Sequence, residues 1–315
     1  MHCPALNLFV PFILLLQPSI ALRIATSLQW IEHTPQPYAI KNFYKGSSKA
    51  TLTSGGVANL GSEPKDFDLA ANAETQGLKQ YANHRNIRLI YVICEVAYRI
   101  VADKRKVTKL SDLKGKKVGT VQGSSAAVFI HNMLTSVGLA DNEYATSSGK
   151  VCMKEPCASD TMPAQLKAGS LDAFGVWEPA VELGARALGA NAITFQNRTV
   201  YREVYALYST TDALNNVAKR KDIVEFVRAL NKTLDVFANQ PKDKGVFNFV
   251  SGQVGVDEKV VESVWEDHKW SGRWNDELIE FIVEEDKYLA KVDKRSVVPR
   301  AELEKFLDTS VLDEL

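Results

Sequence analysis

The sequence predicts an α/β protein with two lobes, each a mainly parallel sheet flanked by helices, and two hinge crossings between them. Strand-like and helix-like apolar patterns alternate along the chain. Two strand-to-helix units follow the same plan, one over residues 117–137 and one beginning at 171. Two long apolar strands, 87–95 and 203–208, can take the chain out of the first lobe and back into it.

Length and charge narrow the range of functions. The chain has 315 residues, enough for one or two domains, and 38 basic residues balance 38 acidic ones. A balanced chain has no strong field to attract nucleic acid or an acidic membrane surface. The hydrophobic fraction of 45% and the charged fraction of 24% are ordinary for a soluble globular protein.

Residues 1–21 predict a secretory signal peptide. They contain no Lys, Arg, Asp or Glu, the run 8–16 is apolar apart from Pro11, and Ser19 and Ala21 supply small residues for cleavage. The protein is therefore expected to be secreted, or periplasmic if bacterial, without stable membrane insertion. The absence of positive charge before the apolar run favours a eukaryotic source.

The first lobe is expected to comprise residues 22–100 and 204–315, and the second lobe residues 101–203. Strands at 22–28, 50–53 and 67–71 lead into polar loops, and 38–44 is expected to be the first helix. Ligands in open α/β sheets bind outside the carboxyl ends of strands. The predicted first-lobe pocket wall is therefore Trp30, Ser54, Gly55, Gly56, Asn72, Glu74 and Thr75.

The second lobe presents a bend of Gly123, Ser124 and Ser125 between the strand 117–121 and a helix that ends at Gly138. Free N–H groups at such a helix start favour an anionic or strongly polar group, although the two serines can also act as simple N-caps. The helix is expected to bury Phe129, Met133, Leu134 and Val137.

Trp177 and Glu178 follow the strand 171–177 and open the next helix. Trp177 is either an apolar platform for a ligand or a core residue. Glu178 either receives a ligand amine or complements the helix N-terminus.

Together, 112–118, 123–125, 167–173 and 177–179 resemble the motifs of type II periplasmic solute-binding proteins. The most similar branch contains sulfonate, nitrate and taurine binders and the fungal thiamine-pyrimidine synthases. The resemblance covers nearly all of residues 22–315 and implies the two-lobed type II fold, in a secreted, fungal-type member. It also implies a small polar or zwitterionic metabolite in the interlobe cleft, no cofactor, and an ABC importer as partner only if the source is bacterial.

An enzyme on the same fold is the first alternative. The synthase's cofactor lysine falls on Asn72 and its donor histidine on Gln76, and its cysteine-rich metal motif has no counterpart at 202–208. Synthase activity is therefore disfavoured. Another reaction is left open, with Glu74, His33 or Tyr98 as acid or base. The second alternative is a scaffold or secreted effector without a ligand.

Cys152 and Cys157 lie in a polar loop and are expected to form a disulfide, because a zinc site would need paired spacings and a nearby His. Cys94 is expected to be a buried thiol. Asn197 and Asn231 begin glycosylation triplets.

The C-terminal third is expected to be helical over 221–238, 257–265 and 276–289. Its tryptophan-rich segment, 265–274, is expected to pack on the first lobe. The acidic stretch 284–286 is expected to be a solvated helix face.

Overall fold

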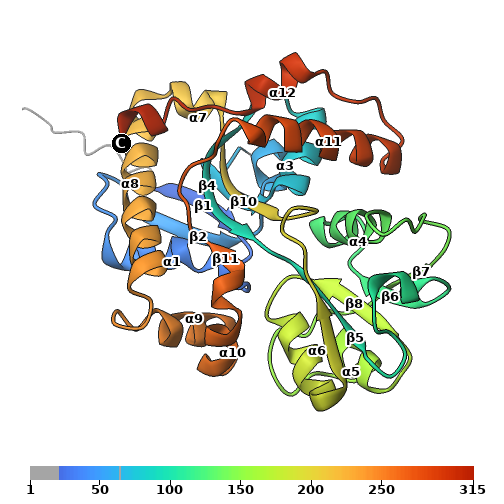
Figure 1. Cartoon of the computed structure of the whole chain (residues 1–315). Helices are drawn as coiled ribbons and strands as arrows, with labels where there is room; N and C mark the ends of the chain where they lie inside the picture. The colour runs from blue at the N-terminus through green and yellow to red at the C-terminus, as the bar shows by residue number, and fades with distance from the viewer. Residues whose placement is uncertain (1–20, 64) are drawn as a thin grey trace, which may run out of the picture.

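The computed structural model describes residues 21–63 and 65–315, so the predicted signal peptide lies outside the described residues apart from its last position. Two sheets with their own helices form two lobes (Figure 1). The first sheet has the order β11 (His268–Lys269), β4 (Ile87–Val96), β10 (Glu203–Thr210), β3 (Leu69–Ala73), β1 (Leu22–Thr26) and β2 (Ala50–Ser54). The second has the order β7 (Ala145–Ser148), β6 (Lys117–Thr120), β8 (Ala173–Val176), β5 (Arg99–Asp103) and β9 (Ala192–Phe195).

Both sheets are mixed. β1 pairs in parallel with β2 and β3, and β6 in parallel with β7 and β8. The strands that enter a lobe from the hinge run the other way: β10 is antiparallel to β3 and β4, and β5 is antiparallel to β8 and β9. The two-lobed α/β prediction is confirmed. The strands β10 and β5 follow the hinge segments directly, without a helical crossover, so they can pair antiparallel with their neighbours and make each sheet mixed.

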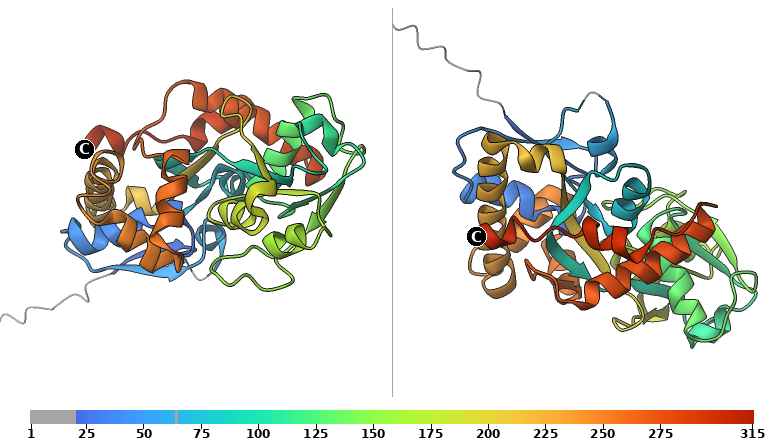
Figure 2. Two further views of the ribbon diagram at one scale, coloured as in Figure 1. Left: turned by 60° about the horizontal axis from the view of Figure 1, so that its bottom comes forward. Right: turned by 90° about the horizontal axis from the view of Figure 1, so that it is seen from above.

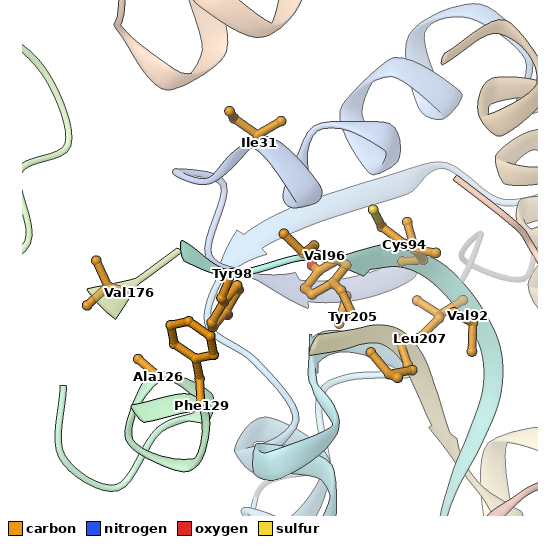
Figure 3. Close-up of a cluster of buried hydrophobic side chains, with 14 of the residues drawn as sticks. Ile31, Val92, Cys94, Val96, Tyr98, Ala126, Phe129, Val176, Tyr205 and Leu207 are labelled. Carbon is orange, nitrogen blue, oxygen red and sulfur yellow. The ribbon is translucent and has the colours of Figure 1, made fainter. Parts of the chain in front are cut away.

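The chain crosses between the sheets twice. Ala97 and Tyr98 join β4 to β5, and residues 196–202 join β9 to β10. Tyr98 is buried, with its ring centroid 5.5 Å from that of Phe129 and 5.7 Å from that of Tyr201. Figure 3 shows Tyr98 beside Phe129, between the strands of the first lobe and Val176 of the second. One apolar core therefore continues through the hinge.

The first lobe carries most of the helices. They are α1 (Pro35–Asn42), α2 (Ala58–Gly61), α3 (Glu74–Asn83), α7 (Thr211–Asn215), α8 (Val217–Asn239), α9 (Val246–Val254), α10 (Glu258–Val264), α11 (Glu277–Val292) and α12 (Arg300–Phe306). Trp265 and Trp270 are buried against Phe237 of α8, with ring centroids 5.6 and 5.1 Å away. The predicted packing of the tryptophan-rich segment on this lobe is confirmed.

The second lobe contains α4 (Ser125–Thr135), α5 (Met162–Lys167) and α6 (Ala180–Leu188). Gly138 has φ +83°, which fits its predicted role after α4. Phe129, Met133 and Leu134 are buried as expected. Val137 is 39% exposed, because the helix ends at Thr135 and the chain has already turned away.

Two local predictions are wrong. Residues 72–75 are not a loop, because β3 continues through Ala73 and α3 begins at Glu74. The stretch 284–286 is solvated only at Glu284: Glu285 is 5% exposed and Asp286 is fully buried. α11 lies over α3 (Figure 1), so this side of the helix is an interface, and Asp286 pairs there with Arg295.

α11 also reaches the second lobe. Figure 2 shows it extending from α3 to α4 (right), where Tyr288 stacks on His131 with 4.3 Å between ring centroids. The nearby Lys291 ammonium lies 3.9 Å from the Asp141 carboxylate. The lobes are thus in contact away from the hinge as well.

Cys152 and Cys157 form a disulfide, and Cys94 is a buried free thiol. Asn197 is exposed, and its side-chain oxygen accepts hydrogen bonds from Thr199. Asn231 lies on α8. Glycosylation of either residue stays a prediction. None of the helices among the described residues is long and apolar enough to cross a membrane.

Candidate functional site

A cavity of about 260 Å³ lies between the lobes. On the first-lobe side it sits at the carboxyl ends of β1 and β3, where an α/β sheet normally presents its ligand site. The second lobe closes it with the bend before α4 and the residue after β8, and the hinge contributes the start of β10. It is lined by Ser27, Trp30, Glu32, His33, Asn72, Ala73, Gln76, Ser124, Ser125, Trp177 and Glu203.

Five of the predicted ligand contacts line this cavity: Trp30, Asn72, Ser124, Ser125 and Trp177. The remaining ones do not: Ser54, Gly55, Gly56, Glu74, Thr75, Gly123 and Glu178. Whether the first group touches a ligand stays a prediction. The positions of the second group have separate physical explanations.

The turn after β2 has already used its N–H groups. Gly55 donates to the Thr26 carbonyl at 3.1 Å, and Gly56 donates to the Asn59 side chain at 2.9 Å. Val57 donates to the side-chain oxygen of Asn72. α2 is a single turn, and these three N–H groups are engaged within the protein.

Glu74 and Thr75 lie behind the cavity and support the hinge. The Glu74 carboxylate accepts hydrogen bonds from the Tyr201 hydroxyl at 2.8 Å and from the Val204 N–H at 2.6 Å. Thr75 donates to Glu285 of α11. Burial raises the pKa of Glu74, and burial together with the charge of Glu74 raises the pKa of Glu285 well above its usual value. These two carboxyls form an internal pair.

Glu178 is 1% exposed and serves α6 and the hinge. One of its oxygens accepts from the Arg99 guanidinium at 2.7 and 2.8 Å, and the other accepts from the Glu182 N–H at 3.0 Å. The carboxylate that was a candidate for a ligand amine is therefore engaged by the protein, as the helix-terminus interpretation expected.

The bend before α4 joins the lobes. Ser124 caps the helix by accepting from the Ala126 N–H at 3.2 Å. The Gly123 carbonyl accepts from the side chains of Gln76 and Lys79 in α3, each at 3.1 Å. Gly123 has φ +74°, a conformation that favours glycine, and this conformation turns its carbonyl toward the first lobe.

Two tryptophans form the aromatic wall of the cavity. Trp30 comes from the first lobe and Trp177 from the second, and their rings meet edge to face with 5.0 Å between centroids. The Trp177 indole N–H is buried and has no hydrogen-bond partner among the described residues. The wall thus combines a large apolar surface with one available donor.

His33 is held as a neutral imidazole. Its Nδ1 accepts from the Ser27 N–H at 3.2 Å, which places the ring proton on Nε2. Thr26 lies 2.8 Å from the same nitrogen, within a chain that continues to Tyr205 and Gln36. Burial lowers the pKa of His33 to about 3. His33 therefore contributes no positive charge to the cavity near neutral pH.

Glu32 and Glu203 are buried carboxyls of the cavity wall, 2% and 3% exposed. Each has one oxygen, Oε2, that is buried without a partner among the described residues. Burial raises the pKa of Glu32 to about 8. Burial and the charge of Glu32 raise that of Glu203 well above its usual value. Nε2 of His33 is 3.8 Å from Glu32, too far for a hydrogen bond.

The sequence offered His33 as an acid or base, but Glu32 was not among the predicted ligand contacts and Glu203 was assigned only to a returning strand. A carboxyl at the first position of an otherwise apolar hinge strand is the signal that identifies it. Ser125 and Tyr98 connect with it: the Ser125 hydroxyl lies 3.1 Å from that of Tyr98 and donates to Glu203 at 3.4 Å. No group of three or more His, Cys, Asp or Glu side chains within the described ranges is arranged to hold a metal ion.

Solved structures of this shape are numerous. An alkanesulfonate-binding protein from Xanthomonas axonopodis pv. citri, bound to MOPS, has 16% identity, TM-score 0.66 and coverage of 93% of this chain and 99% of that one. A Candida albicans protein, described as defining a new family with the generic periplasmic binding protein fold, has 14% identity, TM-score 0.63 and coverage of 93% and 97%. A desulfurization enzyme, at 12% identity, has TM-score 0.60 and coverage of 93% and 98%.

At these identities the likeness establishes the fold alone, the two-lobed periplasmic-binding-protein fold of type II. A comparison with curated protein sequences found no match. The family model described as NMT1/THI5 like matches residues 55–244, more than half of the chain, from the turn after β2 to the turn that follows α8. The chain therefore belongs to the NMT1/THI5-like family.

Proposed function

We propose that the protein is a secreted solute-binding protein that holds a small polar or zwitterionic metabolite between its lobes. The observation that carries this proposal is the cavity of about 260 Å³, whose walls come from both lobes and from the hinge. Its volume is just below the range of about 300–1,000 Å³ that encloses drug-sized molecules, which suits a metabolite. Opposed tryptophans and buried polar groups provide shape and orientation.

The two crossings provide the motion that such a protein needs. Closure around a hinge encloses the ligand, and groups such as Gln76 and Gly123 then meet across the cleft. The disulfide and the predicted signal peptide favour an extracytoplasmic compartment. Delivery to an ABC importer belongs to this proposal only for a bacterial source.

An enzyme on the same fold is the second candidate, because Glu32 and Glu203 are perturbed carboxyls in a cavity. Asn72 and Gln76, which occupy the positions of the synthase's lysine and histidine, also line it, and neither can form an imine or donate an imidazole nitrogen. Glu74 and Tyr98 are outside the cavity, and His33 is too weak a base near neutral pH. Any acid–base role therefore falls to Glu32 or Glu203.

The test is native mass spectrometry of protein purified from its own host, followed by thermal shifts with host extract. Trp177→Ala removes half of the aromatic wall, and Trp274→Ala is the matched control, because Trp274 is also half-buried but does not line the cavity. A saturating ligand, at a hundred times its dissociation constant, should stabilise the wild type by about 2.7 kcal/mol.

We expect a co-purifying metabolite and a thermal shift that Trp177→Ala abolishes and Trp274→Ala preserves. Equal shifts in both variants would place binding elsewhere. No ligand and no shift, even with host extract, would favour the scaffold alternative. Conversion of the bound metabolite during incubation would favour the enzyme.

A further inference from the structure

We propose that the ligand is a small organic cation carrying N–H donors, such as an amine or amidine, whose positive group lies against Glu32 and Glu203 and whose body packs on Trp30 and Trp177. This inference rests on the proposed function and specifies its ligand class. It follows from the lining of the cavity: two carboxyls, two indoles, and among the described lining residues neither Lys nor Arg.

The carboxyls are short of hydrogen-bond donors. Oε2 of Glu32 and Oε2 of Glu203 are both buried without a partner among the described residues, although both side chains line a cavity. An unsatisfied buried acceptor is costly, and a ligand with several N–H groups would satisfy both. A ligand without such donors could pair only with the protonated form of each carboxyl.

The cations of the hinge region are already engaged. Arg99 pairs with Glu178 at 2.7 Å, and also with Glu182 and Asp267, each at 3.3 Å. His33 is neutral. The two cavity carboxyls consequently lack a positive partner among the described groups that surround them, and a bound cation would supply it.

The aromatic wall suits the same ligand. The faces and edges of Trp30 and Trp177 offer an apolar surface to the body of an organic cation, and an indole face also attracts positive charge. A sulfonate or carboxylate would face two carboxyls instead. On the first-lobe side, the N–H groups of the turn after β2 are bound within the protein and are not available to such an anion.

Binding of a cation should release protons and therefore strengthen as pH rises. The charged form of each carboxyl is disfavoured in the empty cavity and favoured beside a cation. The titratable groups that interact with these two carboxyls are His33, Glu74, Cys94, Tyr98, Glu178, Tyr201, Tyr205, Tyr208 and Glu285. Arg99 is tied to Glu178. Displacement of one proton increases the affinity by up to about tenfold per pH unit below the pKa of the carboxyl.

The experiment compares probes of one shape and three charges: benzamidine, benzamide and benzoate, with agmatine as an aliphatic dication and benzenesulfonate as a second anion. Dissociation constants and proton release are measured by calorimetry at pH 6, 7 and 8, in buffers of different ionisation enthalpy. The proteins are wild type, Glu32→Gln, Glu203→Gln, Asp222→Asn and Trp177→Ala. Asp222 is the matched control, because it is a buried carboxyl outside the cavity.

We expect a cation to bind at least tenfold more tightly than benzamide and the anions. Glu32→Gln should weaken this binding at least tenfold and reduce proton release, and Glu203→Gln should do the same, whereas Asp222→Asn should change neither. The inference is overturned if no cation binds, if an anion binds more tightly, or if the cavity variants leave cation binding unchanged. An anion whose binding Trp177→Ala abolishes would overturn this inference and still support the proposed function.

Discussion

Replacing Glu32 by Gln should make the protein more stable at neutral pH and flatten the dependence of its stability on pH. The carboxyl is 2% exposed, and burial raises its pKa from 4.5 to about 8. In the folded protein it therefore keeps its proton where the unfolded chain has already lost it. The folded state binds more protons between these two values, so stability falls as pH rises from 4.5 through 8. Gln keeps the shape and does not ionise.

The size of the effect follows from the two pKa values. Each pKa unit corresponds to about 1.36 kcal/mol, so ionisation of this group removes about 3 kcal/mol of unfolding free energy between pH 4 and pH 7. Glu203 and Glu285 shift in the same direction and add to the slope of the wild type. The difference between wild type and Glu32→Gln isolates the contribution of Glu32.

Urea denaturation followed by tryptophan fluorescence, at several pH values from 4 to 8, measures this difference. The two proteins should be about equally stable near pH 4, and the variant should be more stable by about 3 kcal/mol at pH 7. Glu262→Gln is the control for loss of a surface charge, because Glu262 is exposed. Parallel curves for wild type and Glu32→Gln would refute the assignment of Glu32 as a buried, protonated carboxyl.

Four other outcomes are expected. N-terminal sequencing of secreted protein should find a chain beginning near Leu22, and a chain still beginning at Met would contradict the signal peptide. Replacing Cys152 and Cys157 by Ser should cost about 2 kcal/mol in urea unfolding, as expected for so short a loop; an unchanged midpoint would argue against a contribution from the bond. Asp286→Asn should cost roughly 1–3 kcal/mol, because it removes the charge partner of the partly buried Arg295 guanidinium; a loss below 1 kcal/mol, measured by calorimetry, would refute this. Lys79→Ala removes a hydrogen bond between the lobes that is worth about 1 kcal/mol. Ligand affinity should therefore fall about fivefold, and small-angle X-ray scattering should detect a more open average shape. An unchanged affinity and an unchanged shape would show that this contact does not hold the lobes together.

The parts of the fold that depend on local pattern were predictable. Strands 50–53 and 87–95, the long helix from 221 and the glycine at 138 all appear close to where periodicity and turn chemistry place them. Predictions failed where a distant segment decides the outcome. β3 extends through Ala73 because β10 pairs with it there, and Asp286 is buried because α11 lies on α3. Neither contact has a signature in the neighbouring residues.

The candidate site shows the same division. The rule that ligands lie beyond the carboxyl ends of strands located Trp30, Asn72 and Trp177, which come together at the cavity. The rule does not distinguish a residue that faces the cavity from one that faces the protein, so it also selected Glu74, whose hydrogen-bond partners lie in the hinge. Glu203 escaped it because β10 begins, rather than ends, at the cavity.

The contacts between the lobes indicate how the cleft can open more widely to admit a ligand. Near the cavity the lobes are joined by polar contacts to the Gly123 carbonyl, which water can replace at little cost. At the hinge they share the buried rings of Tyr98, Phe129 and Tyr201, whose exposure would cost far more. Opening should therefore rotate the lobes about the Tyr98 cluster while the cleft side parts. The stacked Tyr288 and His131 must slide in the same motion, so α11 limits how far the cleft opens.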